Sequence, residues 1–204
     1  MAHDPVPDLR ARRRLETQSL IHRAAVDLFE KQGSRGTTVE EIAARAGVSP
    51  RTFFRHFAAK EHAALPGVPR LERAIDALEL AGDTPSAALR AVESMLLAVV
   101  AREPLDELRE NRRLRRIIAS EPEISGLAVA QDQEIARRLR QRLLELGGPE
   151  GAIDEQAAHL VAAVAMAVWR SGWDLWAAEN GDGDSSDPVA AHRGAWTAVR
   201  GLLE

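Results

Sequence analysis

The side chains best suited to binding a charged partner lie close together in the stretch PRTFFRH, residues 50 to 56. Phe53 and Phe57 are four residues apart, a spacing that places both on one face of a helix. Arg51, Arg55 and His56 fall on the other sides. Guanidinium and imidazole groups bind oxygen atoms that carry negative charge. The stretch therefore predicts a short helix whose exposed face meets a polar, negatively charged partner.

The residues on either side of this helix predict how it is positioned. Thr38 and Glu41 have the spacing of a capping box at the start of an earlier helix. Gly47 permits the positive φ of a tight turn, and Ser49 can cap the next helix. The segment from Thr37 to Lys60, TTVEEIAARAGVSPRTFFRHFAAK, is thus predicted to be a helix-turn-helix, a motif that places its second helix in the major groove of DNA.

Charge is distributed unevenly along the chain. Residues 1–62 contain 11 Lys/Arg and 8 Asp/Glu, a net charge of +3, whereas residues 63–204 contain 16 and 23, a net charge of −7. Four arginines occur in the five positions from Arg10 to Arg14. Such a run can reach DNA phosphates or the minor groove, or it can be the solvated start of a helix. Both interpretations stay open, and the charge asymmetry favours a polyanion partner for the first part only.

The hydrophobic pattern predicts an all-α protein of about nine helices and no strand. We expect residues 1–9 to be a disordered arm, residues 10–62 to be a DNA-binding head of three helices, and residues 63–204 to be a C-terminal bundle for dimerisation and ligand binding. The expected helices cover residues 13–32, 39–46, 50–57, a short piece from 60, 70–80, 84–101, 105–119, 127–146, 154–180 and 189–203, and residues 181–188 are expected to form a flexible loop.

Composition excludes several classes of function. The chain has no cysteine, so a disulfide framework and a thiolate metal site are impossible. No nucleophile–base set, phosphate-binding glycine loop or metal motif is present, so we expect neither an enzyme nor a need for a cofactor or metal. No apolar run approaches the roughly 20 residues that span a bilayer, and the N-terminus lacks the apolar segment of a signal peptide. We therefore expect a cytoplasmic protein.

The string GTTVEEIAARAGVSPRTFFRHFAAKE resembles the DNA-binding signature of the TetR family of bacterial transcriptional regulators. The resemblance implies that Pro50 and Arg51 approach base edges. It implies phosphate contacts for four further residues: Thr38, Thr52, His56 and Lys60. Phe54 stands where the family often has tyrosine, which removes a hydroxyl and leaves an apolar contact. From its spacing to Arg51, we also expect Arg55 to contact phosphate or a base.

Three tryptophans lie on one face of a predicted helix in the C-terminal bundle. Trp169, Trp173 and Trp176 are spaced by four and three residues, and Met166 precedes them on the same face. These four residues line either the core or dimer interface or a pocket for a small apolar or amphipathic effector. The family resemblance implies a homodimer through the last two helices. The arginines at 112, 113, 115 and 116 are expected to form a solvated face paired with Glu107 and Glu110.

The sequence thus leads to a functional hypothesis. The protein is expected to be a sequence-specific DNA-binding regulator, a repressor that leaves its double-stranded DNA operator when a small molecule binds the C-terminal bundle. Such release requires the ligand to bind the two states with different affinity. The alternative is a DNA-binding regulator, either an activator or a constitutive one, without a small-molecule ligand.

Overall fold

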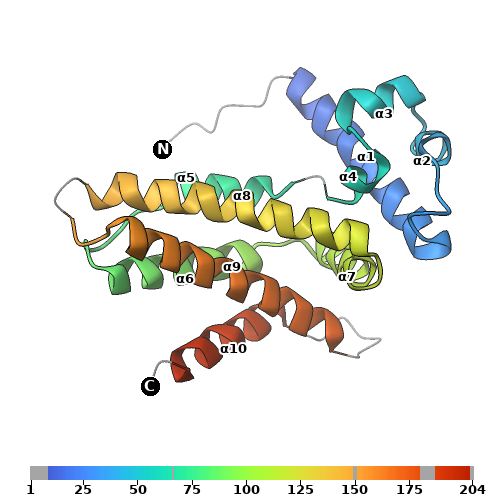
Figure 1. The fold of residues 1–204 in the computed structure, drawn as a ribbon. Coiled ribbons are helices and arrows are strands. Elements are labelled where there is room, and N and C mark those ends of the chain that lie inside the picture. Colours follow the sequence, from blue (N-terminus) through green and yellow to red (C-terminus); the bar gives the residue numbers. More distant parts are fainter. Residues whose placement is uncertain (1–8, 66, 149–150, 180–186, 203–204) are drawn as a thin grey trace. The chain divides into compact units, whose positions relative to one another are not determined.

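The computed structural model describes residues 9–65, 67–148, 151–179 and 187–202, and in these ranges it contains ten helices and no strand (Figure 1). The helices are α1 (Leu9–Gln32), α2 (Val39–Arg45), α3 (Pro50–His56), α4 (Lys60–Ala64), α5 (Pro69–Asp76), α6 (Pro85–Ala101), α7 (Leu105–Ser120), α8 (Pro122–Gly147), α9 (Glu155–Ala178) and α10 (Pro188–Gly201). The all-α prediction is confirmed. None of these helices is long and apolar enough to cross a membrane.

The chain forms two compact units. The first contains the chain up to Gly67 and the segment Arg116–Ala128, and the second contains Val68–Arg115 and the chain from Val129 onward. Helices α7 and α8 each contribute residues to both units. The corner between α7 and α8 therefore belongs to the same unit as the predicted helix-turn-helix, although α5, α6 and α7 separate it from α4 in the chain.

The turn between α2 and α3 has the predicted local chemistry. The capping box is confirmed: the amide of Glu41 donates to Thr38 Oγ1 at 3.2 Å, and the amide of Thr38 donates to Glu41 Oε2 at 2.8 Å. Gly47 adopts φ 68°, a conformation that costs glycine little. Ser49 then caps α3 by accepting from the amide of Thr52 at 3.1 Å.

The core of the first unit holds α3 in place. Phe53 is fully buried and Phe57 is 7% exposed, as their spacing predicted. Their rings lie 5.9 Å apart, and Ile21 of α1 and Ile42 of α2 are fully buried in the same unit. Fully burying side chains of this size contributes about 1.5–3 kcal/mol each. Burial of one side of α3 leaves its polar side outside.

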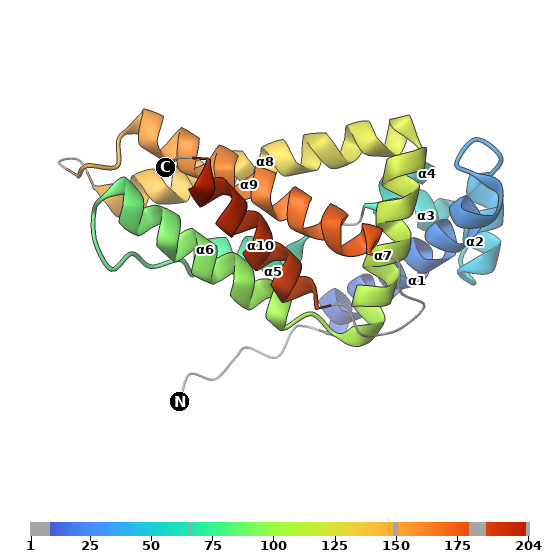
Figure 2. The same ribbon diagram turned by 90° about the horizontal axis from the view of Figure 1, so that it is seen from below.

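The second unit has one continuous hydrophobic core, with residues from α5, α6, α8, α9 and α10. Helix α10 packs against both α9 and α6, and it crosses them in Figure 2. Trp169, Trp173 and Trp176 of α9 and Trp196 of α10 are all buried in this core. Adjacent rings on α9 meet edge to face at 5.5 Å, the arrangement that aromatic pairs prefer.

His192 of α10 fits among these tryptophans. Its ring lies 4.8 Å from the ring of Trp173 and 5.6 Å from that of Trp169. Its Nδ1 lies 2.8 Å from the carbonyl oxygen of Pro188. Burial lowers the pKa of His192 against the effect of that hydrogen bond, which favours the neutral ring. This placement gives His192 a structural role in the core.

Gly172 of α9 makes room for the His192 ring. A Cβ atom at this position would lie 2.5 Å from Cγ and Cδ2 of the ring, far inside van der Waals contact. The absence of a side chain is therefore a packing requirement here. Gly194 of α10 differs, because nothing lies within 4 Å of a Cβ built there.

Several helix boundaries differ from the sequence prediction. Helix α1 begins at Leu9 rather than near Arg13, and α8 begins at Pro122 rather than near residue 127. Proline suits a first helical turn, which explains the earlier start of α8. Helix α5 ends at Asp76, four residues before the predicted end, and Leu78 instead donates its amide to Ile75. Residues 1–8 of the expected arm and residues 181–186 of the expected loop lie outside the described ranges.

The packing of His192 against Gly172 gives a prediction. Gly172→Ala should lower the free energy of unfolding by about 1–3 kcal/mol, since overpacking forces the ring away. Gly126→Ala, the same change at an exposed position of α8 where nothing lies within 4 Å of an added Cβ, should be neutral or stabilising by up to about 1 kcal/mol. Thermal unfolding followed by circular dichroism measures both. Equal melting temperatures for the two variants would contradict the packing role.

Candidate nucleic-acid interface

Helix α3 presents a polar, basic face to solvent. Pro50, Arg51 and Arg55 are exposed, and Phe54 is 56% exposed. The Phe54 ring meets the buried Phe53 ring edge to face at 5.5 Å, so it is held in place although it faces outward. Arginine near the start of a recognition helix can bind guanine O6 and N7 in the major groove, and an apolar ring can contact a thymine methyl group. The face combines both kinds of group.

Two hydroxyl groups near this face already serve as helix caps. Thr38 Oγ1 accepts from the Glu41 amide and also lies 3.0 Å from Glu41 Oε2, to which it donates. Thr52 Oγ1 lies 3.0 Å from Ser49 Oγ. The hydrogen bonds from the backbone and side chain of Thr38, and one from Gln32, lower the pKa of the Glu41 carboxyl and keep it ionised. A phosphate that binds Thr38 must compete with this carboxylate for the hydroxyl proton.

The family resemblance implied that Lys60 contacts a DNA phosphate, but its side chain also binds backbone groups of the protein. Its ammonium group donates to the carbonyl oxygens of Ser34 and Thr37, both at 2.7 Å, and lies 3.9 Å from Glu61 Oε1. Two of its three donors are therefore used inside the protein. The loop between α1 and α2 thereby gains a donor for the carbonyl groups of its two buried residues, Ser34 and Thr37. Lys60 is placed to stabilise the head, and a phosphate contact would use its remaining donor.

Glu121, at the corner between α7 and α8, is a residue that the sequence analysis missed. Its carboxylate accepts from the amide of Ser34 at 3.2 Å and from the Ser34 hydroxyl at 2.8 Å. Nearby, Arg35 forms an ion pair with Glu123 at 3.5 Å. Glu121 and Lys60 thus bind the same short loop from two sides. No local pattern predicts these contacts, because the partners are separated by many residues in the chain.

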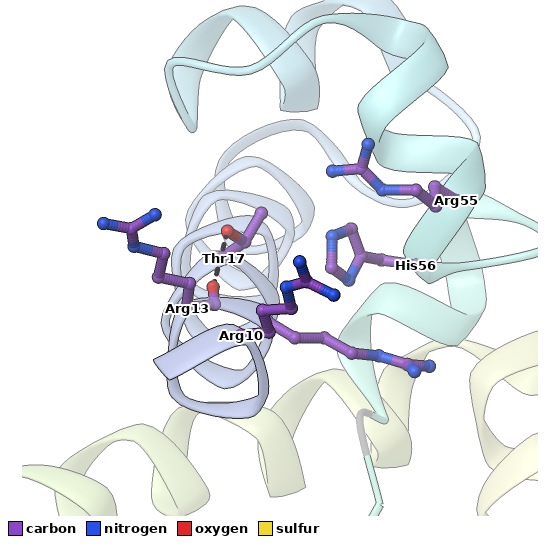
Figure 3. A pocket seen from close by; sticks show the side chains of 6 residues that line it. Arg10, Arg13, Thr17, Arg55 and His56 are labelled. Carbon is purple, nitrogen blue, oxygen red and sulfur yellow. Dashed lines mark hydrogen bonds between the residues drawn. The ribbon is translucent and has the colours of Figure 1, made fainter. Parts of the chain in front are cut away.

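The predicted arginine run and α3 surround a hollow of about 380 Å³ in the first unit (Figure 3). Its lining consists of residues from α1 and α3: Arg10, Arg13, Arg14, Thr17, Arg55 and His56. Figure 3 shows the His56 ring turned from α3 toward α1. Arg12, the remaining arginine of the run, is instead exposed and pairs with Glu16 at 3.1 Å. The run therefore divides into side chains that line the hollow and one that does not.

His56 is in an unusual electrostatic position. Both of its ring nitrogens are shielded from solvent, and neither has a hydrogen-bond partner within the described residues. Desolvation lowers the pKa of His56, and the positive charges of Arg55 and Arg14 lower it further. The ring is therefore neutral near pH 7 and positioned to donate or accept one further hydrogen bond.

The residues predicted to line an effector pocket are all in the core of the second unit. Met166, Trp169, Trp173 and Trp176 are each at most 6% exposed, and they pack against residues of their own chain. The indole nitrogens of Trp173 and Trp196 are buried without a hydrogen-bond partner among the described residues. An unpaired buried donor costs about 1–3 kcal/mol. These two donors are among the polar groups in this core that a bound molecule could satisfy.

Charged residues lie beside the tryptophan cluster. The guanidinium carbon of Arg112 lies 4.3 Å from the centre of the Trp176 ring, within cation–π distance. Arg115 is within 3.5 Å of Asp174, and burial lowers its pKa. Arg170 binds Asp132 at 2.8 Å. The prediction that the arginines at 112 to 116 form a solvated face is wrong for Arg112 and Arg115, because aromatic and acidic groups on other helices replace water around them.

No group of three or more His, Asp or Glu side chains within the described ranges is arranged to hold a metal ion. The first unit presents arginine and histidine side chains that can donate hydrogen bonds to an anion. The second unit contains partly buried ion pairs between arginine and aspartate. An exposed basic helix face, positioned by a buried aromatic face, matches a major-groove reader rather than a catalytic centre.

Comparisons with known proteins agree with this interpretation. Residues 21–62 match the model of the family described as bacterial regulatory proteins, tetR family. The chain is 33% identical over 172 residues to the HTH-type transcriptional regulator TcmR of Streptomyces glaucescens, a match that covers 80% of this chain and 74% of that protein.

Two solved structures show the same fold. A TetR transcriptional regulator from Rhodococcus sp. RHA1 has a TM-score of 0.50 and 20% identity, with 92% of this chain and 97% of that chain covered. A TetR-family regulator from Rhodococcus sp. has a TM-score of 0.51 and 17% identity, with 93% and 100% covered. The helix-turn-helix, the all-α fold and the sequence relationship lead to one conclusion: the chain belongs to the TetR family of DNA-binding transcriptional regulators.

Proposed function

We propose that this TetR-family regulator is a homodimeric repressor that reads its operator through α3 and leaves it when a small molecule binds the second unit. The proposal that α3 reads DNA rests on one observation, the division of this helix into two faces. Phe53 and Phe57 form the buried face, and Arg51, Phe54 and Arg55 lie on the exposed face. Seven residues form this helix, so its orientation is set by that burial.

The proposed DNA contacts fall into two classes. Pro50, Arg51 and Phe54 approach base edges, where a good bidentate arginine contact discriminates by about 1–3 kcal/mol. Contacts to phosphates fix the register without reading sequence. We assign phosphate contacts to Thr38, Thr52, Arg55, His56 and Lys60. We also retain residues 10–62 as the proposed DNA-binding domain and 63–204 as the proposed dimerisation and effector domain.

The proposed dimer uses α9 and α10. Leu160 and Leu175 of α9 are 53% and 52% exposed on the single chain, and their spacing places them on the same helix face as the exposed Ala167. Exposed Gly194 and Ala198 of α10 would allow another helix to approach closely. A twofold dimer places two recognition helices about 34–36 Å apart, in successive major grooves.

The proposed effector enters the tryptophan-lined region of the second unit. Support comes from Met166, Trp169, Trp173 and Trp176 and from the unpartnered indole donors of Trp173 and Trp196. An apolar or amphipathic molecule with a hydrogen-bond acceptor suits this chemistry. The full burial of the four predicted pocket residues also favours a second candidate, a DNA-binding regulator that has no small-molecule ligand.

A first prediction separates base reading from the other roles on the head. Selection from random DNA duplexes should yield a preferred operator for the wild type. The Arg51→Ala variant should bind that operator about 5–150-fold more weakly than the wild type does, whereas its affinity for unrelated DNA should change little. Fluorescence anisotropy at several salt concentrations measures both affinities. Absence of any sequence preference in the wild type would remove the proposed function.

Lys60→Met is the matched comparison for Arg51→Ala, because it also removes one positive charge. It should lower the melting temperature, since the carbonyl group of Thr37 loses its donor and that of Ser34 keeps only the Thr37 amide. It should also weaken binding to all DNA sequences alike. Arg51 is exposed, so Arg51→Ala should leave the melting temperature within about 1 °C. Equal effects of the two variants on sequence preference would contradict these roles.

A second prediction concerns the dimer. Replacing Leu160 and Leu175 together with Asp should convert the protein to a monomer in light scattering, because four apolar side chains of the dimer would become charged. Leu105→Asp is the control, as Leu105 is 63% exposed on α7, outside the proposed interface. A double variant that stays dimeric would place the interface elsewhere.

A third prediction tests effector release. A screen of aromatic and amphipathic compounds should find some that release bound operator and also quench the tryptophan fluorescence of the wild type. For those compounds, Trp173→Phe should weaken the response several-fold, since it removes the indole donor and keeps an aromatic ring. Release that is unchanged in Trp173→Phe would exclude this site, and failure of every compound would favour the regulator without a ligand.

A further inference from the structure

The hollow between α1 and α3 is lined almost wholly by cations. Its lining consists of Arg10, Arg13 and Arg14 of α1, Arg55 and His56 of α3, and Thr17. Thr17 donates its hydroxyl to the carbonyl oxygen of Arg13 at 2.9 Å, so its proton is used locally. Among the residues that the structure describes, no carboxylate lines the hollow. Like charges gathered in this way raise the free energy of the protein unless an anion joins them.

The arginines of this hollow differ from others in the chain. The side chains of Arg13, Arg14 and Arg55 make no hydrogen bond or ion pair with any other described residue. Elsewhere, arginines of the second unit bind carboxylates, as in the pairs Arg138–Asp76 and Arg170–Asp132. On α1 itself, Arg12 pairs with Glu16. The guanidinium groups of Arg13, Arg14 and Arg55 are therefore available to an external anion.

His56 supplies the second, independent observation. Its two ring nitrogens are inaccessible to solvent and lack a partner within the described residues, although the ring faces a group of cations. If the ring turns to bring one nitrogen to the surface of the hollow, an anion there would accept a hydrogen bond from it and would offset the charges of Arg14 and Arg55. Both effects favour the protonated imidazole.

We propose that this hollow binds one phosphate group, with Arg14 and Arg55 neutralising its charge and His56 donating a hydrogen bond and taking up a proton as the phosphate binds. The proposal rests on the proposed DNA-binding function for its physiological ligand and extends it to α1 and to a dependence on pH. The hollow exceeds the size of a single phosphate group, which suits a phosphodiester with a sugar on each side. Free inorganic phosphate shares the same chemistry.

The direction of the pH effect follows from the charges. In the free protein, burial and the charges of Arg55 and Arg14 hold the pKa of His56 below its ordinary value of 6.5, and Arg10 and Arg13 are the other charged residues that line the hollow. A bound phosphate raises this pKa, so binding takes up a proton and affinity rises as pH falls through the interval between the two values. Each unit of difference between the bound and free pKa allows at most about a tenfold gain in affinity.

The test follows the His56 Cε1 proton by NMR from pH 5 to 8 in the full-length protein, with the signal identified by its loss in His56→Gln. Three samples are compared: the free protein, the protein with inorganic phosphate, and the protein with a duplex selected from random DNA. A rise of the His56 pKa with phosphate alone identifies free phosphate as a ligand, and a rise only with DNA identifies the backbone. No rise in either sample overturns the proposal.

Variants make the test specific to the hollow. Arg14→Gln should raise the His56 pKa of the free protein and lower the slope of log affinity for DNA against log salt by about 0.9, the contribution of one phosphate. Arg12→Gln removes the same charge from α1 outside the hollow and should change neither quantity. His56→Gln should abolish the difference in DNA affinity between pH 5.5 and 7.5 that the wild type shows.

The outcomes also separate this site from the proposed function. DNA binding with an unchanged His56 pKa would overturn the phosphate site and leave the regulator intact. A His56 pKa that rises with inorganic phosphate, in a protein without sequence preference for DNA, would support the site and overturn the proposed repressor. Equal salt slopes for Arg14→Gln and Arg12→Gln would remove Arg14 from the site.

Discussion

Burial of Phe53 and Phe57 is the constraint on which the DNA-binding unit depends. Helix α3 has seven residues, too few to be stable in water by itself, because helix nucleation is costly. Ser49 satisfies one terminal amide, and Pro50 removes another unpaired amide at the first position. The remaining stabilisation comes from the two buried rings. Since those rings fix which side of α3 faces inward, they also fix which side chains face a partner.

A second set of contacts, polar rather than apolar, organises the loop between α1 and α2. Lys60 and Glu121 bind backbone groups of this loop from α4 and from the α7–α8 corner. The loop contains the buried residues Ser34 and Thr37, and Lys60 and Glu121 supply partners for the Thr37 carbonyl and the Ser34 amide. The side chain of Lys60 therefore serves the fold, although its position in the motif suggests a phosphate contact. One ammonium group has three donors, so the two roles are compatible.

The second unit is built on a different kind of constraint. Its tryptophans and His192 meet edge to face in a tight cluster, and Gly172 provides the space for the histidine ring. Burying an arginine such as Arg115 beside this cluster requires a nearby carboxylate, here Asp174. The same chemistry that packs the core also supplies indole donors and ion pairs that a ligand could rearrange. Core and effector site are thus not exclusive interpretations of the tryptophan face.

Local patterns in the sequence were sufficient for the helical class, the capping box at Thr38, the turn at Gly47 and the inward face of α3. Each depends on residues within four positions of one another, where backbone geometry is nearly fixed. Tertiary structure alone decided the partners of Lys60, the role of Glu121, the burial of Arg115 and the meeting of the α1 arginines with His56. These contacts join residues far apart in the chain, and their energies depend on desolvation, which only the folded arrangement sets.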